Sequence, residues 1–169
     1  MLGLLTNSHV MGQNSVENNV QQFVVERLVF DAQGQFSAIG HKTMVASEAN
    51  LGLLVNRRLY AYASTGMLWR LDETNGIRSF HKASTVGGGL GYRLIDNQAG
   101  RASLDWRIAL SQGIGKSSLS CTVYDSQVRL RFGGKVLVPT IGVGFKHLHS
   151  HATGLKSHNY LYATIGIGL

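Results

Sequence analysis

The sequence predicts an all-β fold: a closed antiparallel up-and-down transmembrane β-barrel of eight strands. Apolar and polar residues alternate along most of the chain, most regularly over residues 159–169. Because successive side chains of a strand point to opposite faces, each such segment has one aliphatic face and one small or polar face. Gly is abundant at 21, Pro almost absent at 1, and only 15% of the residues are charged, below the quarter typical of soluble domains. No stretch reaches the ~20 apolar residues of a spanning helix, so the hydrophobicity is spread over strands.

The chain divides into a polar N-terminal tail, residues 1–21, and a barrel domain, residues 22–169. Residues 15–28 fit an amphipathic helix, but β-branched and aromatic residues dominate residues 23–30 and favour a first strand there. Residues 31–34, Asp-Ala-Gln-Gly, are typical of a turn.

The next two strands are expected at residues 44–55 and 59–71, joined by a tight turn at residues 56–58. In the second of them, apolar residues take the odd positions, and tyrosines and Arg70 take the even ones. A polar loop is expected at residues 72–82.

A strand at residues 85–94 and a turn at 95–100 precede the most regular two-faced strand of the chain, residues 103–111. A loop follows at residues 113–118.

Residues 119–132 predict another strand, with a β-bulge near Tyr124 and Asp125 where the alternation slips. A tight turn at Gly133 and Gly134 leads into a strand over residues 136–147. The last loop and the last strand complete the count of eight. The polar loops at 72–82 and 148–158 are the expected contact surfaces.

The composition of the two faces favours an aliphatic face turned outward to lipid. The polar face is rich in Gly, Ser and Thr and carries charges of both signs, which suits the crowded interior of a small barrel. A soluble exterior is denser in Lys and Glu, and glycine weakens a strand without packing. We therefore expect a barrel interior formed by Arg70, Arg93, Asp105, Arg107, Arg129 and Arg131. The expected lipid-facing residues are Leu59, Met67, Trp69, Leu90, Leu104, Trp106, Ile108, Leu110, Ile141, Val143, Phe145, Ile165 and Ile167.

The interior arginines permit two interpretations. One is a plug of ion pairs that stiffens the fold, and the other is a path that prefers anions. An eight-stranded barrel is narrow and its interior is filled by side chains, which favours the plug.

Net charge, cysteine content and the N-terminal residues exclude several classes of partner and feature. The net charge of +7 suits anionic lipid headgroups, whereas the basic residues are dispersed and form no nucleic-acid motif. The single cysteine, Cys121, cannot form an intrachain disulfide. We expect no cofactor. Residues 1–20 lack the basic segment and the long apolar run of a secretory signal peptide.

The segments Leu90-Gly-Tyr-Arg-Leu94 and Ala102-Ser-Leu-Asp-Trp106, separated by a turn, resemble the short periplasmic hairpins of small bacterial outer-membrane β-barrels of the OmpX and OmpA transmembrane-domain type. The resemblance is architectural and covers residues 22–169. It implies a bacterial outer-membrane location, contact with phospholipid and lipopolysaccharide, and insertion by the barrel-assembly machinery. Such chains usually end in an aromatic residue, and this one ends in Leu169.

The last loop carries His147, His149 and His151, which share one strand face and are spaced for Zn²⁺, Ni²⁺ or Cu²⁺. No carboxylate or thiolate joins them, so a solvated loop without metal is the favoured interpretation. Residues 147–169 also show a local resemblance to lipid A deacylases of the PagL type. In that resemblance His149 matches the catalytic base, but His151 occupies the serine position and Ser150 lies one residue early.

These patterns predict an integral outer-membrane protein with a non-enzymatic role in envelope stability, surface interaction or pore formation. The alternatives are an outer-membrane lipid A deacylase or esterase, with His149, Ser150 and His151 as its candidate residues, and a soluble lipocalin-like ligand-binding barrel.

Overall fold

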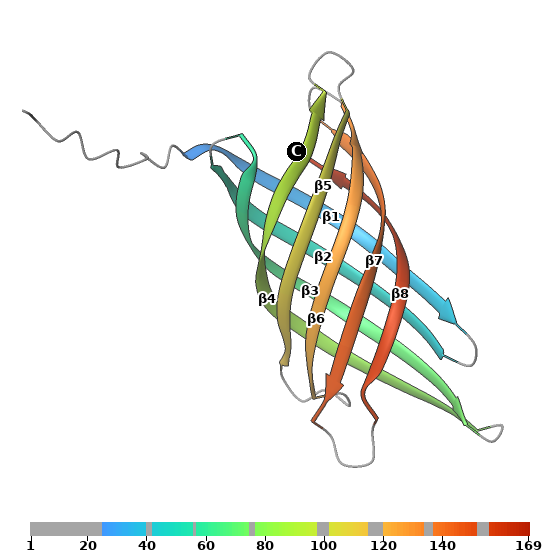
Figure 1. Cartoon of the computed structure of the whole chain (residues 1–169). Helices are drawn as coiled ribbons and strands as arrows, with labels where there is room; N and C mark the ends of the chain where they lie inside the picture. The colour runs from blue at the N-terminus through green and yellow to red at the C-terminus, as the bar shows by residue number, and fades with distance from the viewer. Residues whose placement is uncertain are drawn as a thin grey trace, which may run out of the picture.

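The computed structural model of the chain describes residues 25–39, 42–55, 57–74, 77–97, 102–114, 120–133, 137–151 and 156–169. These residues form an all-β structure (Figure 1). Its strands are β1 (Val25–Ile39), β2 (Lys42–Val55), β3 (Leu59–Thr74), β4 (Ile77–Asn97), β5 (Ala102–Ile114), β6 (Cys121–Phe132), β7 (Val138–Ser150) and β8 (His158–Gly168). Within these ranges, no helix is long and apolar enough to cross a membrane.

The eight strands form one closed barrel in which each strand pairs antiparallel with the next along the chain. The barrel closes where β1 pairs with β8, from Asp31 opposite Gly168 to Phe36 opposite Ala163. Closure removes the free sheet edges that would otherwise leave backbone N–H and C=O groups unpaired. The predicted all-β, eight-stranded, up-and-down architecture is confirmed.

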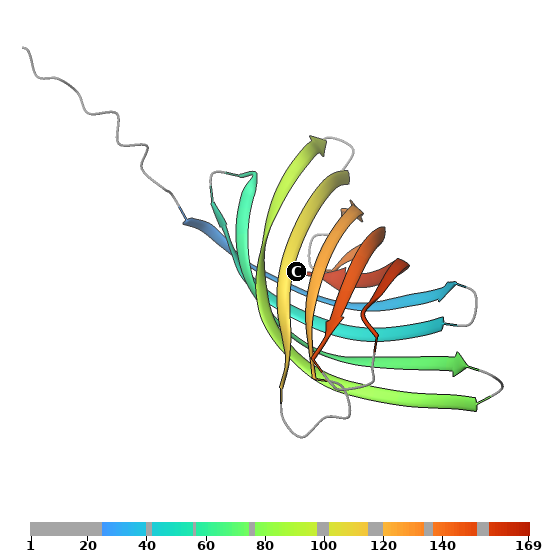
Figure 2. The same ribbon diagram turned by 60° about the horizontal axis from the view of Figure 1, so that its bottom comes forward.

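The two ends of the barrel differ. At the turn end lie the start of β1, the end of β8 and the β2–β3 turn, in which Arg57 adopts a left-handed φ of 63°. At the loop end, β1 is followed by β2, β3 by β4, β5 by β6 and β7 by β8. The hairpins β1–β2 and β3–β4 extend away from β5–β8 at this end (Figure 2).

Two predicted breaks consist largely of strand instead. The prediction of a turn at residues 31–34 is wrong, because β1 continues to Ile39 and stays paired with β2 throughout this segment. The polar residues Asp31 and Gln33 are buried toward the interior, while Ala32 and Gly34 face outward. Their polarity therefore reflects the polar interior and not a turn.

The prediction of a loop at residues 72–82, one of the two expected contact surfaces, is also wrong. β3 runs to Thr74 and β4 begins at Ile77, with these two residues paired. The antiparallel ladder thus extends into the polar segment on both strands, as far as Thr74 and Ile77. The other expected contact surface, residues 148–158, is shorter than predicted, since β7 runs to Ser150 and β8 begins at His158.

The β-bulge predicted near Tyr124 and Asp125 is absent from the described strands, because β6 pairs with β5 and β7 without a shift there. The apparent slip arises because the inner row of β6 changes from apolar Cys121 and Val123 to polar Asp125 and Gln127. Ser126 lies on the outer face, where its Oγ accepts a hydrogen bond from Trp106 Nε1 at 3.1 Å. Register shifts occur instead at Val25/Arg27 and at Arg93/Ile95.

A two-faced barrel wall as the candidate functional site

The outer face of the barrel is apolar. Every residue expected to face lipid has its side chain on this face, half-buried for Trp69 and Leu104 and exposed for the others, up to 70% for Ile165. Other large apolar residues that the sequence analysis did not single out share this face, among them Leu28, Phe30, Phe36, Leu51 and Leu161. Phe36 was missed because residues 31–34 were predicted to be a turn that ends the first strand.

The inner face holds the charges. The six residues expected in the barrel interior are at most 7% exposed: Arg70, Arg93, Asp105, Arg107, Arg129 and Arg131. The structure brings five of them together in the half of the barrel nearer the turn end. Arg70 lies apart, at the loop end, where its Nη1 donates to the carbonyl oxygen of Lys156 at 3.1 Å.

Two carboxylates organise the arginine cluster. Asp105 forms ion pairs with Arg131 at 3.4 Å, Arg93 at 3.5 Å and Arg129 at 3.9 Å. Asp31 pairs with Arg129 at 3.1 Å and with Arg107 at 3.3 Å. Ions this deeply buried persist only when paired and hydrogen-bonded, so the two carboxylates hold four strands in one network.

Asp31 was not among the interior residues predicted from the sequence, although a signal for it exists. Val29, Asp31, Gln33, Gln35 and Ser37 form one row of β1, and all five are buried. The residues between them are apolar or small: Leu28, Phe30, Ala32, Gly34, Phe36 and Ala38. Period-two alternation across residues 28–38 would have placed Asp31 inside.

A second buried pair lies nearer the loop end. Lys146 Nζ is 3.1 Å from Asp125 Oδ2, and the Tyr162 hydroxyl donates to the other oxygen of Asp125 at 2.6 Å. The interior space between Glu48, Asp125 and Lys146 has a volume of about 10 Å³, room for about one water molecule. Side chains therefore fill the barrel here.

Beyond this pair and Arg70, the loop-end half of the interior is mostly apolar. Its packed cluster consists of Met44, Ala46, Leu68, Ala83, Cys121, Val123, Leu148, Tyr160 and Tyr162. The interior thus combines a charged half with a mostly apolar half.

Tyrosine side chains pack over glycines of the neighbouring strand. In the strand register Tyr60 lies opposite Gly91, Tyr62 opposite Gly89 and Tyr162 opposite Gly144. A Cβ at any of these glycines would overlap the tyrosine ring. The missing side chains therefore make room for the rings inside the narrow barrel, and the Arg107 guanidinium stacks over Tyr62 at 3.9 Å.

The loop-end residues with catalytic potential are arranged differently from the expectation. His149 Nδ1 lies 3.3 Å from Ser157 Oγ, and this same oxygen accepts from the backbone N–H of Ser150 at 3.1 Å. His151 contacts Thr122 Oγ1 at 2.8 Å. Ser157, which was not among the residues predicted from the sequence, is thus the serine beside His149, and no carboxylate of the described residues contacts His149.

The histidine row itself is confirmed as a spatial unit. The rings of His147 and His149 are 6.4 Å apart, and those of His149 and His151 are 4.9 Å apart. In the part of the chain that the structure describes, no group of three or more His, Cys, Asp or Glu side chains is arranged to hold a metal ion.

A comparison with models of known protein families and with curated proteins gives no match. The function therefore has to be argued from the two-faced wall itself.

Proposed function

We propose that this chain is an integral β-barrel protein of a bacterial outer membrane, with a non-enzymatic role and a closed interior. The observation that carries the proposal is the polarity of the wall. Large apolar side chains cover the outside, while arginines, aspartates and glutamines fill the inside.

The outer face needs an apolar environment. Leu28, Val143 and Ile165 are each about two-thirds exposed, and similar residues surround the barrel on all eight strands. Monomeric soluble proteins rarely expose contiguous apolar patches larger than a few hundred Å². Acyl chains would cover this surface without requiring a protein partner.

The backbone supports the same environment. Hydrocarbon offers no hydrogen bonds, so a spanning structure has to pair its N–H and C=O groups internally, as closed barrels do. An even number of antiparallel strands is typical of bacterial outer-membrane barrels, which also alternate apolar and polar residues along each strand. A soluble ligand-binding barrel would have the opposite arrangement, with its apolar face around a cavity.

Among the possible non-enzymatic roles, the packed interior favours structural anchoring over conduction. The turn-end half is crossed by the ion pairs of Asp31 and Asp105, and the loop-end half by the apolar cluster. A conducting path would require both layers to open. We therefore infer a role in envelope stability or in surface interaction through the loop end.

The test of membrane integration is refolding from urea into detergent micelles, with boiled and unboiled samples compared by gel electrophoresis. We expect a heat-modifiable shift, because a closed barrel keeps its structure in the unboiled sample. A monodisperse, folded protein in plain buffer would contradict the proposal. Planar-bilayer recordings test the closed interior, and regular conductance steps would overturn that part alone.

Acyl-ester hydrolysis is the weaker alternative. Nucleophilic catalysis needs a base next to the nucleophile and a third group that orients the base. Ser157 and His149 supply the first two, but the chain contains no Asp or Glu after Asp125. Release of acyl chains from lipid A by the folded protein, abolished by His149→Ala, would replace the structural role with this one.

A further inference from the structure

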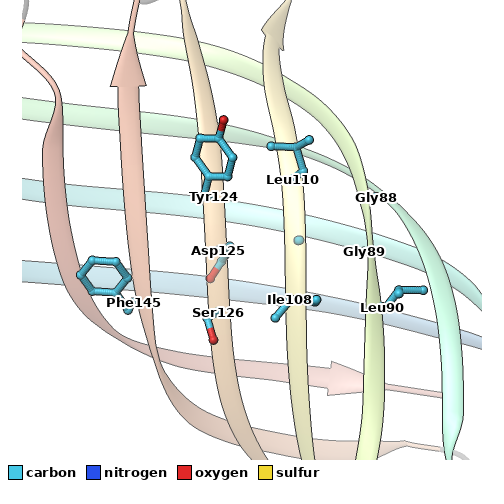
Figure 3. A pocket seen from close by; sticks show the side chains of 10 residues that line it. Gly88, Gly89, Leu90, Ile108, Leu110, Tyr124, Asp125, Ser126 and Phe145 are labelled. Atoms are coloured by element: carbon cyan, nitrogen blue, oxygen red, sulfur yellow. The ribbon is translucent and has the colours of Figure 1, made fainter.

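A hollow on the outer face lies over β4 to β7. Its volume is about 400 Å³, and it is bounded by Leu90, Ile108, Leu110, Tyr124 and Phe145 (Figure 3). Gly88 and Ser126 stand between these larger residues and leave the space open. The lining is mostly apolar; its polar residues are Ser126, Tyr124 with its hydroxyl, and Asp125, whose side chain turns inward to Lys146.

The strand register arranges the outer face in rows that change in character toward the loop end. One row consists of Leu90, Ile108, Ser126 and Phe145, and the next of Gly88, Leu110, Tyr124 and His147. The third contains Val86, Gln112, Thr122 and His149. Rows two residues apart are separated by about 7 Å. Toward the loop end, the outer surface therefore changes from the aliphatic side chains of Leu90 and Ile108 to the aromatic ring of Tyr124 and then to the imidazole of His149. The three rows together are shorter than one lipid molecule.

Tyr124 connects the hollow to the histidines. Its ring lies 6.0 Å from that of His147, and its hydroxyl points toward the end of the sheet at which β5 and β7 finish (Figure 3). His149 and His151 follow His147 along the chain, beyond the hollow, and their rings form the histidine row. Lys156 is exposed in the adjoining loop.

The segment that carries the histidine row has no acidic side chain. Residues 126–169 contain no Asp or Glu, and the side chain of Asp125 turns inward to Lys146. An anionic group that approaches β6–β8 from outside near the loop end therefore meets imidazole and ammonium groups of this segment and no carboxylate of it. This complementarity selects a ligand that is apolar at one end and anionic at the other.

We propose that this surface is a site for a phosphate-bearing lipid, with one acyl chain in the hollow and the phosphate against His147, His149 and His151. The inference rests on the proposed membrane location, and it names the lipid chemistry that the barrel selects. Imidazole N–H groups donate to phosphate oxygens, and basic residues near a membrane surface attract anionic lipids.

Trp106 provides the probe. It lies on the outer face one row from the hollow, and its indole donates to Ser126. In a Trp69→Phe background it is the remaining tryptophan, since the chain has 2. The protein is folded into phosphatidylcholine vesicles that contain a minor fraction of phosphatidylglycerol with brominated chains, which quench indole fluorescence on contact. Matched vesicles carry brominated phosphatidylcholine instead.

We expect the apparent local concentration of the brominated anionic lipid at Trp106 to exceed that of the zwitterionic one by about fivefold. The double variant His147→Gln/His149→Gln should lose this preference, whereas the control Lys82→Gln on β4 should keep it. Ser126→Leu, which fills the hollow, should also lower quenching, and the control Ala61→Leu on the outer face of β3 should not.

Equal quenching by the two lipids would overturn the inference, as would a preference unaffected by both the histidine and the Ser126 variants. An excess of inorganic phosphate that abolishes the preference would assign the histidines to free phosphate and also overturn the lipid site. Gel mobility of the same samples separates the two proposals. A heat-modifiable barrel without lipid preference refutes this inference alone, and a protein that does not fold into vesicles refutes the proposed function.

Discussion

Asp105 is the residue on which the interior charges converge. Its side chain is fully buried, pairs with arginines of β4 and β6, and accepts a hydrogen bond from the Tyr60 hydroxyl at 3.3 Å. The carboxylate therefore compensates several cations that would otherwise be buried without a counter-charge.

Asp105→Asn should destabilise the barrel by about 3–5 kcal/mol, because removing one partner of a buried ion pair leaves the other charge uncompensated. Urea unfolding in detergent micelles measures this change. The matched control is Asp96→Asn, since Asp96 also pairs with Arg93 but is partly exposed, and exposed pairs contribute about 0–1 kcal/mol. Equal effects of the two substitutions would contradict a network centred on Asp105.

The tyrosine–glycine pairs make a second prediction at the scale of the residue. Gly91→Ala places a Cβ into the ring of Tyr60 and should cost about 1–3 kcal/mol through overpacking. Gly34→Ala is the control, because the nearest atom to its added Cβ is the Ile165 carbonyl oxygen at 4.0 Å. The two unfolding midpoints should differ clearly, and coincident midpoints would show that the rings have room to move.

At the scale of the strand, β5 shows most directly how alternation becomes two environments. Trp106, Ile108 and Leu110 are exposed, and Ser103, Asp105 and Arg107 are buried. The sequence pattern alone predicted this strand and the side that each of these residues faces.

Ile108→Lys tests the environment of the outer face. A lysine on the lipid face near the bilayer midplane costs about 2–4 kcal/mol, and the cost falls to about 0–1 kcal/mol near the interfaces. Ile108 lies near the middle of β5, whereas Phe80 lies near the loop-end start of β4. Refolding equilibria in vesicles should therefore show a larger loss for Ile108→Lys than for Phe80→Lys. Similar small losses would indicate that the outer face contacts water.

Strands were predictable from the sequence where polar residues alternate with large aliphatic ones, and not where polar residues follow one another. Residues 103–111 and 159–169 met the first condition. Residues 31–34 continue the alternation of β1, but with Ala32 and Gly34 in place of large aliphatic residues. Residues 72–82 have the composition of a loop, and only the pairing of β3 with β4 extends these strands to Thr74 and Ile77. Long-range pairing is a property of the folded sheet, so local composition does not contain it.

The site was predictable to a similar degree. The interior arginines followed from the face that they share, but their partner Asp31 depended on the corrected course of β1. Ser157 lies outside both flanking strands, so no periodicity placed it beside His149. The hollow depends on rows contributed by four strands, and the register that aligns them was not part of the sequence pattern.

At the scale of the whole molecule, the closed barrel has two functionally different ends. The turn end is near the arginine cluster, and the loop end combines the apolar interior cluster with the outer histidine row. In the proposed membrane location, this distribution predicts a protein with a closed interior and a lipid-selective outer face. Its interactions would then take place at the loop end and along the lipid-facing wall.

The most direct test of the membrane barrel is a nitroxide scan of β5 in lipid vesicles. It uses a Cys121→Ala background, so that each label is unique. Labels at Ile108→Cys and Leu110→Cys should collide frequently with oxygen, which partitions into acyl chains, and rarely with a water-soluble nickel complex. The inward-facing Ala109→Cys should be protected from both reagents. Frequent collisions of the nickel complex at positions 108 and 110 would place the aliphatic face in water and contradict the membrane barrel.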